Sequence, residues 1–384
     1  MIPVNEPLIG EKELEYVNEC LRTGWISSAG RFIEEFEEKW AAYCGMKYGI
    51  AMSNGTTALQ AAVRSLNLKP GDKIVIPTFT IVSCAQAVTY NDCVPVLVDC
   101  EADTWCMNVE QVREKVEDNY AHGDGRIKAI MPVHIYGHPV DMDPINELAE
   151  RYGLFVIEDA AEVHGAQYLS GRHSKEPAWK RCGGLGHVST FSFYANKLIT
   201  TGEGGMVLTS DASLAETARG FRNLCFLPGR RFYHERLGYN FRMTNLQAAL
   251  GVAQLERMDE IVAKKRWIGQ AYTDRLGDIS SLQLSVEKTW ARHVYWMYSI
   301  VIDEATGINA SVLAFRLRGM GVETRPFFLG MHEQPVFHDM GLFLNERYPV
   351  AERIANQGLY LPSGLTLTES QIDNICEIVR TVLK

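Results

Sequence analysis

The chain has 384 residues, of which 46% are hydrophobic and 22% are charged, and its formal net charge is −9 at pH 7. The length predicts about two domains, and the composition is that of an ordinary globular protein. The negative balance, with scattered lysines and arginines, argues against binding to nucleic acid or to an anionic membrane surface. No stretch approaches the roughly 18 uninterrupted apolar residues of a membrane span.

The cysteines and the N-terminus indicate a reducing compartment. The nine cysteines form no CxxC pair and show no regular spacing. Cys44, Cys84 and Cys225 lie in apolar helix-like or strand-end contexts, which predicts buried free thiols. The first residues lack the basic and apolar regions of a signal peptide. We therefore expect a cytoplasmic protein.

The first 250 residues alternate short apolar runs with helical patterns, which predicts a mainly parallel α/β sheet. Most of the runs are continuously apolar, as expected for strands that are covered on both faces. The expected strands are 48–53, 73–77, 94–99, 127–133, 154–159, 188–193 and 206–209. The expected helices between them include 56–66, 84–90, 144–152 and 212–222.

The pattern changes near residue 250. Thr244 opens a helical pattern that runs to about residue 276, and Gln247 completes a capping box with it. Strands near 295–302 and 322–325 then surround a helix at 310–320, and a last helix covers 369–383. We expect a large α/β domain over 1–250, with an N-terminal arm at 1–30, and a smaller α+β domain over 251–384.

Lys197 lies between the apolar run 188–193 and a glycine-rich turn at 202–205. Such surroundings hold a lysine in place, as an enzyme does with an amine that forms a Schiff base. Asp159 and Glu162 follow another apolar run. An amine for an aldehyde and an anion for a ring nitrogen are what pyridoxal phosphate requires. Taken alone, Asp159 is equally well explained as a helix cap, and Glu162 as a solvent-facing helix residue.

Gly55 and Thr56 lie in a turn of small polar residues, Ser53 to Leu59, that joins a strand to a helix. Backbone N–H groups at such a helix N-terminus favour a phosphate, although a plain N-cap explains the same residues. His134 and His138 are four residues apart, but Gly137 and Pro139 argue against a helix, so we reject a metal site. Arg242, just before the long helix, suits an anionic substrate.

Motifs along nearly the whole chain resemble those of the DegT/StrS-type nucleotide-sugar aminotransferases. These are fold-type I pyridoxal-phosphate enzymes with an aspartate-aminotransferase-like fold. The matching segments are 24–28, 53–59, 132–137, 158–162, 196–197, 238–245 and 325–328.

The resemblance implies a role for each matching residue. Lys197 would carry the cofactor and move the proton, Asp159 would hold the ring nitrogen, and Glu162 would lie near the cofactor's O3′. The phosphate would be held by Gly55, Thr56 and Ser192, and by Asn240 from a partner subunit. The substrate would meet Trp25, Ser28, Arg242, Phe328 and His332.

The same resemblance implies a homodimer with shared active sites. Glutamate would donate the amino group to the 4-keto carbon of a nucleotide-linked 6-deoxy sugar. GDP-4-keto-6-deoxymannose is the favoured substrate, and a dTDP- or UDP-linked keto sugar is the alternative. Enzymes of this kind serve surface-polysaccharide biosynthesis.

Two departures from the family pattern bear on specificity. Ile81 stands where many relatives carry an aromatic residue stacked on the cofactor ring, and the connection 171–187 is longer than usual.

Three rival functions carry less weight. Sugar dehydratases of this fold replace the lysine with histidine. A non-catalytic cofactor-binding regulator would not need Lys197, Asp159 and Asn240 together. A nicotinamide-dependent oxidoreductase needs a glycine-rich dinucleotide fingerprint, which is absent after the first strand.

Overall fold

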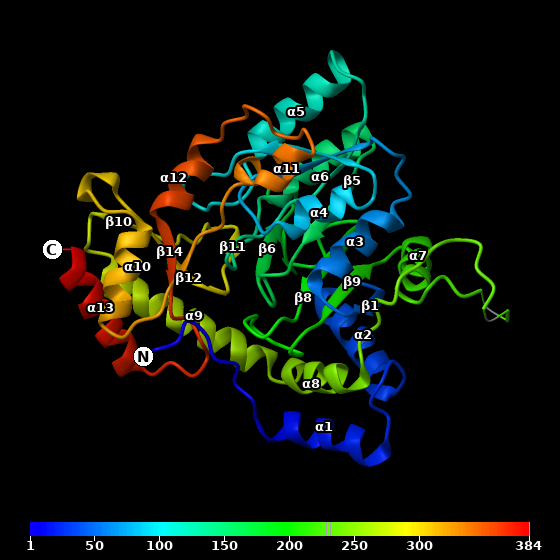
Figure 1. Cartoon of the computed structure of the whole chain (residues 1–384), viewed down its shortest axis with the longest axis horizontal. Helices are drawn as coiled ribbons and strands as arrows, with labels where there is room; N and C mark the ends of the chain where they lie inside the picture. Colours follow the sequence, from blue (N-terminus) through cyan, green and yellow to red (C-terminus); the bar gives the residue numbers. More distant parts are fainter. Residues whose placement is uncertain (228, 231, 384) are drawn as a thin grey trace.

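The computed structural model describes every residue except 228, 231 and 384 (Figure 1). Its main sheet has seven strands in the order β1-β9-β8-β5-β4-β2-β3. β9 runs antiparallel to both of its neighbours, and the other pairings are parallel. The bounds are β1 Tyr48–Met52, β2 Lys73–Pro77, β3 Val94–Val98, β4 Ile127–Ile130, β5 Phe155–Asp159, β8 Val188–Ser192 and β9 Gly205–Thr209. The predicted seven-stranded, mainly parallel sheet is confirmed.

Helices cover this sheet. Consecutive residues of β5, β8 and β9 are buried although they point to opposite faces, so both faces are covered. Four of these helices, α3, α4, α6 and α7, correspond to the helices named from the sequence. The helices of this part are α1 Glu11–Thr23, α2 Arg31–Cys44, α3 Gly55–Ser65, α4 Ser83–Thr89, α5 Val109–Ala121, α6 Met142–Tyr152 and α7 Ala212–Arg222.

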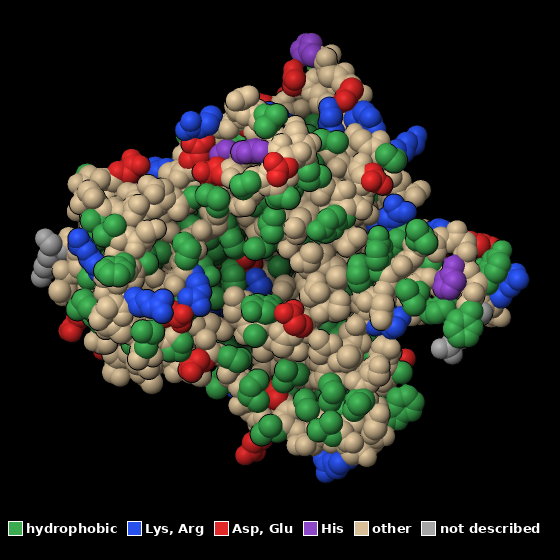
Figure 2. All heavy atoms as spheres, in the orientation of Figure 1, with side chains coloured by type: hydrophobic (Ala, Val, Ile, Leu, Met, Phe, Trp, Pro, Cys, Tyr) green, Lys and Arg blue, Asp and Glu red, His purple; other side chains and the backbone are tan. Residues whose placement is uncertain are grey.

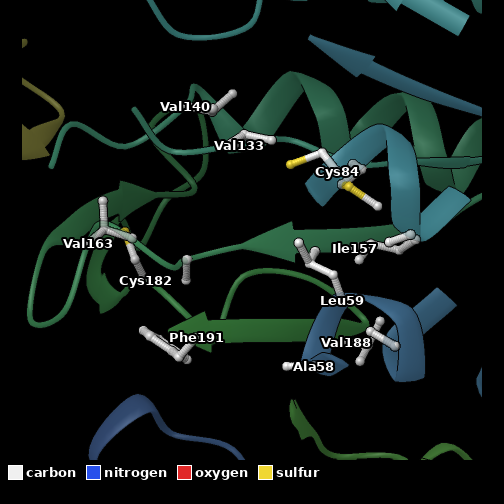
Figure 3. Close-up of a cluster of buried hydrophobic side chains, with 14 of the residues drawn as sticks. Ala58, Leu59, Cys84, Val133, Val140, Ile157, Val163, Cys182, Val188 and Phe191 are labelled. Carbon is white, nitrogen blue, oxygen red and sulfur yellow. The ribbon is translucent and has the colours of Figure 1, made fainter. Parts of the chain in front are cut away.

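The core between α3, α4 and the sheet is drawn in Figure 3. Ala58 and Leu59 of α3 lie against Ile157 of β5 and Val188 of β8, and all four side chains are buried. Close packing of this kind keeps the strand ends and the helix N-termini beside them in fixed positions.

Two smaller antiparallel sheets complete the fold, in the orders β10-β12-β14-β13 and β11-β6-β7. The β12 strand begins three residues later than predicted, since Tyr295 has a φ of 48° that a strand does not allow. The segment 171–187 is not a plain loop, because it contains β7. The bounds are β6 Gln167–Ser170, β7 Ala178–Arg181, β10 Leu282–Leu284, β11 Ala291–Arg292, β12 Tyr298–Ile302, β13 Arg325–Pro326 and β14 Gly358–Leu361.

The single helix predicted from Thr244 to about residue 276 is wrong: it is two helices, α8 (Asn245–Leu255) and α9 (Met258–Leu276). The break falls at Arg257, which has non-helical backbone angles and pairs with Glu13 of α1. The predicted capping box is present, since Thr244 and Gln247 bond to each other's backbone N–H. The remaining helices are η1 Glu304–Thr306, α10 Ala310–Gly319, η2 Met331–Glu333, α11 Pro335–Asp339, α12 Pro349–Gln357 and α13 Glu369–Leu383.

Buried apolar residues form two clusters, and α9 contributes to both. Ile261 belongs to the larger cluster and Ile268 to the smaller, which also packs against Ile2. Ile2 pairs with Val322, so the start of the predicted arm lies against the C-terminal part. The domain boundary after residue 250 stays a prediction. All nine cysteines are free and buried, as expected, and none of the described helices is long and apolar enough to cross a membrane.

Candidate active site

A cavity of about 650 Å³ lies at the carboxyl ends of β1, β5 and β8. This is the edge of an α/β sheet where ligands bind. Lys197, Asp159 and Glu162 line it, together with Gly55, Thr56 and Ser192. The structure therefore brings together six of the residues predicted from separate motifs. Figure 2 shows the molecule hollowed near the centre of the drawn face, with acidic and basic side chains inside the hollow.

Lys197 lies in the connection between the antiparallel strands β8 and β9. The N–H of Phe193 donates to the carbonyl of Gly204, at 2.8 Å, and that of Thr201 donates to the carbonyl of Phe193, at 2.9 Å. The Lys197 side chain is about one-tenth exposed, and its Nζ lies 3.5 Å from a carboxylate oxygen of Glu162. Burial lowers the pKa of Lys197, so a larger share of the amine is unprotonated near neutral pH than in water.

Asp159 ends β5 at the bottom of the cavity and is 1% exposed. One of its carboxylate oxygens accepts from the N–H of Ala161 at 3.1 Å, and the other accepts from the thiol of Cys84 at 3.2 Å. Burial raises the pKa of Asp159, and the two donors act against that rise. A cationic group placed beside Asp159 would keep this carboxyl ionised.

Glu162 connects the lysine to the loop after β4. Its second carboxylate oxygen accepts from the backbone N–H of Tyr136 at 2.8 Å. Burial raises the pKa of Glu162 to about 7, although Lys197 acts in the opposite direction. The pKa values of Glu162 and Lys197 are therefore shifted toward each other, which favours exchange of a proton between the two groups.

The N-terminus of α3 forms the other end of the cavity. Asn54 caps this helix through Thr57, so the cap and the predicted phosphate turn are one structure. A Cβ on Gly55 would lie 2.8 Å from the Cβ of Ser192, so glycine lets the helix approach β8. The hydroxyls of Thr56 and Ser83 lie 2.8 Å apart beside it. Free N–H groups and hydroxyls at a helix N-terminus suit a phosphate.

Unpaired buried atoms indicate that the cavity is built for a polar ligand. Thr190 Oγ1 and Asn196 Oδ1 are buried without a hydrogen-bond partner among the described residues, and both residues line the cavity. Buried polar atoms are normally hydrogen-bonded, so we expect these two oxygens to bond to a ligand or to water. With a phosphate end at α3, an acid at β5 and an amine between them, the described residues fit pyridoxal phosphate.

Five predicted residues lie elsewhere. Ser28 and Arg242 line a second hollow of about 550 Å³, together with Arg219 and Arg222. Asn240 and Trp25 are exposed. His332 is buried and bonded to Thr78 and Glu352, so this chain does not present it to the Lys197 cavity. Phe328, by contrast, lines the cavity as expected.

The structure adds cavity residues that the sequence did not indicate. Trp296 and Tyr360 come from the C-terminal third, and the Lys197 Nζ lies 3.7 Å from the centroid of the Trp296 ring. No short motif marks either residue. Ile81 lines the mouth and is 43% exposed. Of the described chain, no residue of 171–187 lines this cavity.

His134, Glu158 and Cys182 are close enough together to hold a metal ion among the described residues. Their atoms are engaged otherwise, since Glu158 accepts from His134 and from the backbone N–H groups of residues 183, 185 and 186. His134 Nδ1 accepts from the N–H of Val140 at 2.9 Å, and His138 has separate partners. This carboxylate supports the loop after β7.

Comparison with known proteins identifies the family of the chain. Residues 7–380 match the DegT/DnrJ/EryC1/StrS aminotransferase family. The chain is 39% identical to a GDP-perosamine synthase of Escherichia coli O157:H7, covering 98% of this chain and 97% of the relative. It is 40% identical to a GDP-perosamine synthase of Caulobacter vibrioides, covering 100% and 98%. The crystal structure of the aminotransferase TlmJ from Streptoalloteichus hindustanus superposes with a TM-score of 0.88 at 28% identity, over 99% of this chain and 98% of that one.

Fold and site define a pyridoxal-phosphate-dependent aminotransferase. The chain belongs to the DegT/DnrJ/EryC1/StrS aminotransferase family. Bound pyridoxal phosphate supplies an aldehyde carbon and a ring that accepts electrons. The protein supplies an amine of lowered pKa, a carboxyl that titrates near neutrality, and a buried acid opposite the helix N-terminus.

Replacing Gly55 by alanine is expected to weaken pyridoxal phosphate binding about ten-fold or more. The added methyl group would crowd Ser192 and push the α3 N-terminus away from the phosphate. Titration of the visible absorbance with cofactor gives the affinity. Gly319→Ala is the matched control, because a Cβ there meets no atom within 4 Å. Equal affinities for Gly55→Ala and wild type would contradict a phosphate position at Gly55.

Proposed function

We propose that the protein transfers the amino group of glutamate to the 4-keto carbon of GDP-4-keto-6-deoxymannose, producing GDP-perosamine for a surface polysaccharide such as O-antigen. It would act in the cytoplasm. The observation that carries the chemistry is the amine of Lys197 in one cavity with Asp159, Glu162 and the α3 N-terminus. The sugar assignment rests on relatives named GDP-perosamine synthase that match over nearly their full length.

The protein's own groups suffice for the proton movements of such a transfer. Lys197 would take a proton from the glutamate Cα and deliver one to the sugar carbon, because its pKa is lowered by burial. Glu162, with a pKa of about 7, would receive and return the proton of Lys197 across 3.5 Å. Asp159 would hold the cofactor's ring nitrogen in its cationic form.

We further propose that two chains complete each active site. Ser28, Asn240 and Arg242 are absent from the Lys197 cavity of their own chain. The segment after α7 extends from the body in Figure 1, and Leu237 in it is 88% exposed. Three guanidinium groups, of Arg219, Arg222 and Arg242, line the second hollow. In a homodimer, Asn240 and the hollow would meet the partner's cavity and its anionic ligands.

Incubation with glutamate and a panel of 4-keto GDP-, dTDP- and UDP-sugars tests the sugar assignment. We expect amination of the GDP sugar with a kcat/KM at least about 100-fold above the others. Mass spectrometry of the product and release of 2-oxoglutarate measure it. Amination of a dTDP- or UDP-linked sugar alone would reject the GDP assignment and keep the aminotransferase. Loss of a hydroxyl group without amination would identify a dehydratase.

A further inference from the structure

Lys265 of α9 is a buried lysine outside the cavity, and it is 1% exposed. Its Nζ donates to the carbonyl oxygen of Trp296 at 2.7 Å and to that of Ser363. Burial lowers the pKa of Lys265 to about 7, and none of the described carboxylates offsets this effect. A buried amine without an ion pair is costly, so a hydrocarbon would serve better here if filling space were the only task.

The contacts of Lys265 fix the backbone of Trp296. The amine draws together two segments, one entering β12 and one leaving β14. Its neighbours on α9 act likewise, since Lys264 donates to the carbonyl of Leu367 at 3.0 Å and Arg266 to that of His293 at 2.6 Å. Of these three donors, Lys265 is the one that bonds Trp296.

Trp296 in turn contacts the residues around the reacting amine. It is 3% exposed, and its indole N–H donates to the carbonyl of Asn196 at 2.7 Å. Its ring face lies 3.7 Å from Lys197 Nζ, measured to the centroid. An ammonium group held over the face of an indole is stabilised by the ring electrons, most strongly where water is excluded.

We propose that Trp296 is a further catalytic residue, which holds the free amine of Lys197 and stabilises its protonated form, and that Lys265 is the positioning residue that fixes Trp296. This inference rests on the proposed role of Lys197. The titratable groups that face the amine from other elements are Glu162, Asp159 and Cys84, with His164 behind them. The indole ring faces the amine as well. It offsets part of the cost of burying the ammonium, so the amine can both accept and release a proton.

The pKa of Lys197 in the cofactor-free full-length protein tests the role of the ring. Trace acetic anhydride acetylates neutral amines, and mass spectrometry of the Lys197 peptide between about pH 6 and about pH 11 gives the titration. Trp296→Leu removes the ring face, and we expect the pKa of Lys197 to fall by about one pH unit. Trp296→Phe keeps an aromatic face and is expected to remain within about 0.3 pH unit of wild type.

Lys265→Met tests the positioning role, with Lys264→Met as its matched control. Freed from its carbonyl bond, Trp296 would shift, and we expect kcat to fall about ten-fold with little change in the KM for glutamate. The pKa of Lys197 should fall in the same direction as in Trp296→Leu. Lys264→Met loses a comparable carbonyl bond that does not involve Trp296. It should keep both the activity and the titration of Lys197.

An unchanged titration of Lys197 in folded Trp296→Leu would overturn the proposal. A lower melting temperature for Lys265→Met with an unchanged pH profile of kcat would reduce Lys265 to a structural residue. If Lys265→Met does not fold, the comparison of Trp296→Leu with Trp296→Phe alone tests the proposal. A shifted pKa of Lys197 in protein that aminates no keto sugar would uphold the contact and reject the proposed function.

Discussion

Replacing Lys197 by alanine is expected to lower kcat for amino transfer by about 10⁴-fold or more. The substitution removes both the amine that bonds the cofactor and the group that moves the proton, and the effects of such groups are large. Glu162 cannot replace it, because a carboxylate forms no Schiff base and this one is held by the N–H of Tyr136. Formation of 2-oxoglutarate under single-turnover conditions measures the loss.

Two further measurements separate lost chemistry from lost structure. Lys197→Ala should lack the visible absorbance band of wild type after gel filtration and should keep the same far-ultraviolet circular dichroism. Burial raises the pKa of Glu162, and Lys197 lowers it. Without the lysine, the buried carboxyl can take up a proton and become neutral, so the fold should persist. Lys264→Ala is a control at a lysine remote from the cavity. Residual turnover above about 1% of wild type would show that another group is the proton carrier.

Co-expression of two variants that are inactive alone is expected to restore about a quarter of the wild-type activity, if two chains complete each site. Lys197→Ala lacks the amine but keeps Asn240. Asn240→Asp keeps the amine but would set a carboxylate against the phosphate of the partner's cofactor, where like charges cost several kcal/mol. Random pairing makes about half of the dimers hybrid, and each hybrid has one intact site of two.

Activity after co-expression of differently tagged chains, followed by tandem purification of the hybrid, measures this recovery. Purified hybrid should reach about half of the wild-type rate per dimer. Asp303→Asn is a suitable partner control, because Asp303 caps the short η1 helix away from the cavity. A hybrid of Lys197→Ala with Asn240→Asp that stays inactive would place Asn240 in the site of its own chain.

The sequence predicted the main sheet well because most of its strands are short, continuously apolar runs. It also indicated cavity residues that end or follow β5 and β8, since Asp159 and Ser192 are the last residues of these strands and Glu162 and Lys197 come soon after them. Local patterns could not indicate Trp296 or Tyr360, which reach the cavity through folding of the C-terminal third. They also did not indicate that the helix after Thr244 breaks at Arg257, whose partner Glu13 lies far away in the chain.

The residues for which we propose a role across two chains are a different case. Arg242 and Asn240 were recognised from the motif 238–245, but the cavity of a single chain lacks both. His332 was expected to meet the substrate, and in this chain it bonds to Thr78 and Glu352 and does not line the Lys197 cavity. A sequence motif indicates that a residue type is important at a position. The coordinates are needed to show on which side of an interface that residue acts.

The antiparallel pairing of β8 with β9 makes the position of the Lys197 amine depend on the length of the connection between the two strands. Ser192 ends β8 opposite Gly205, and the connection between them carries Lys197. Adding or deleting one residue before Lys197 would leave the strand register intact while displacing the amine from Glu162 and Trp296. The connection thus sets how far the amine lies from the end of β8. It should tolerate substitutions on its exposed side far better than any change in length.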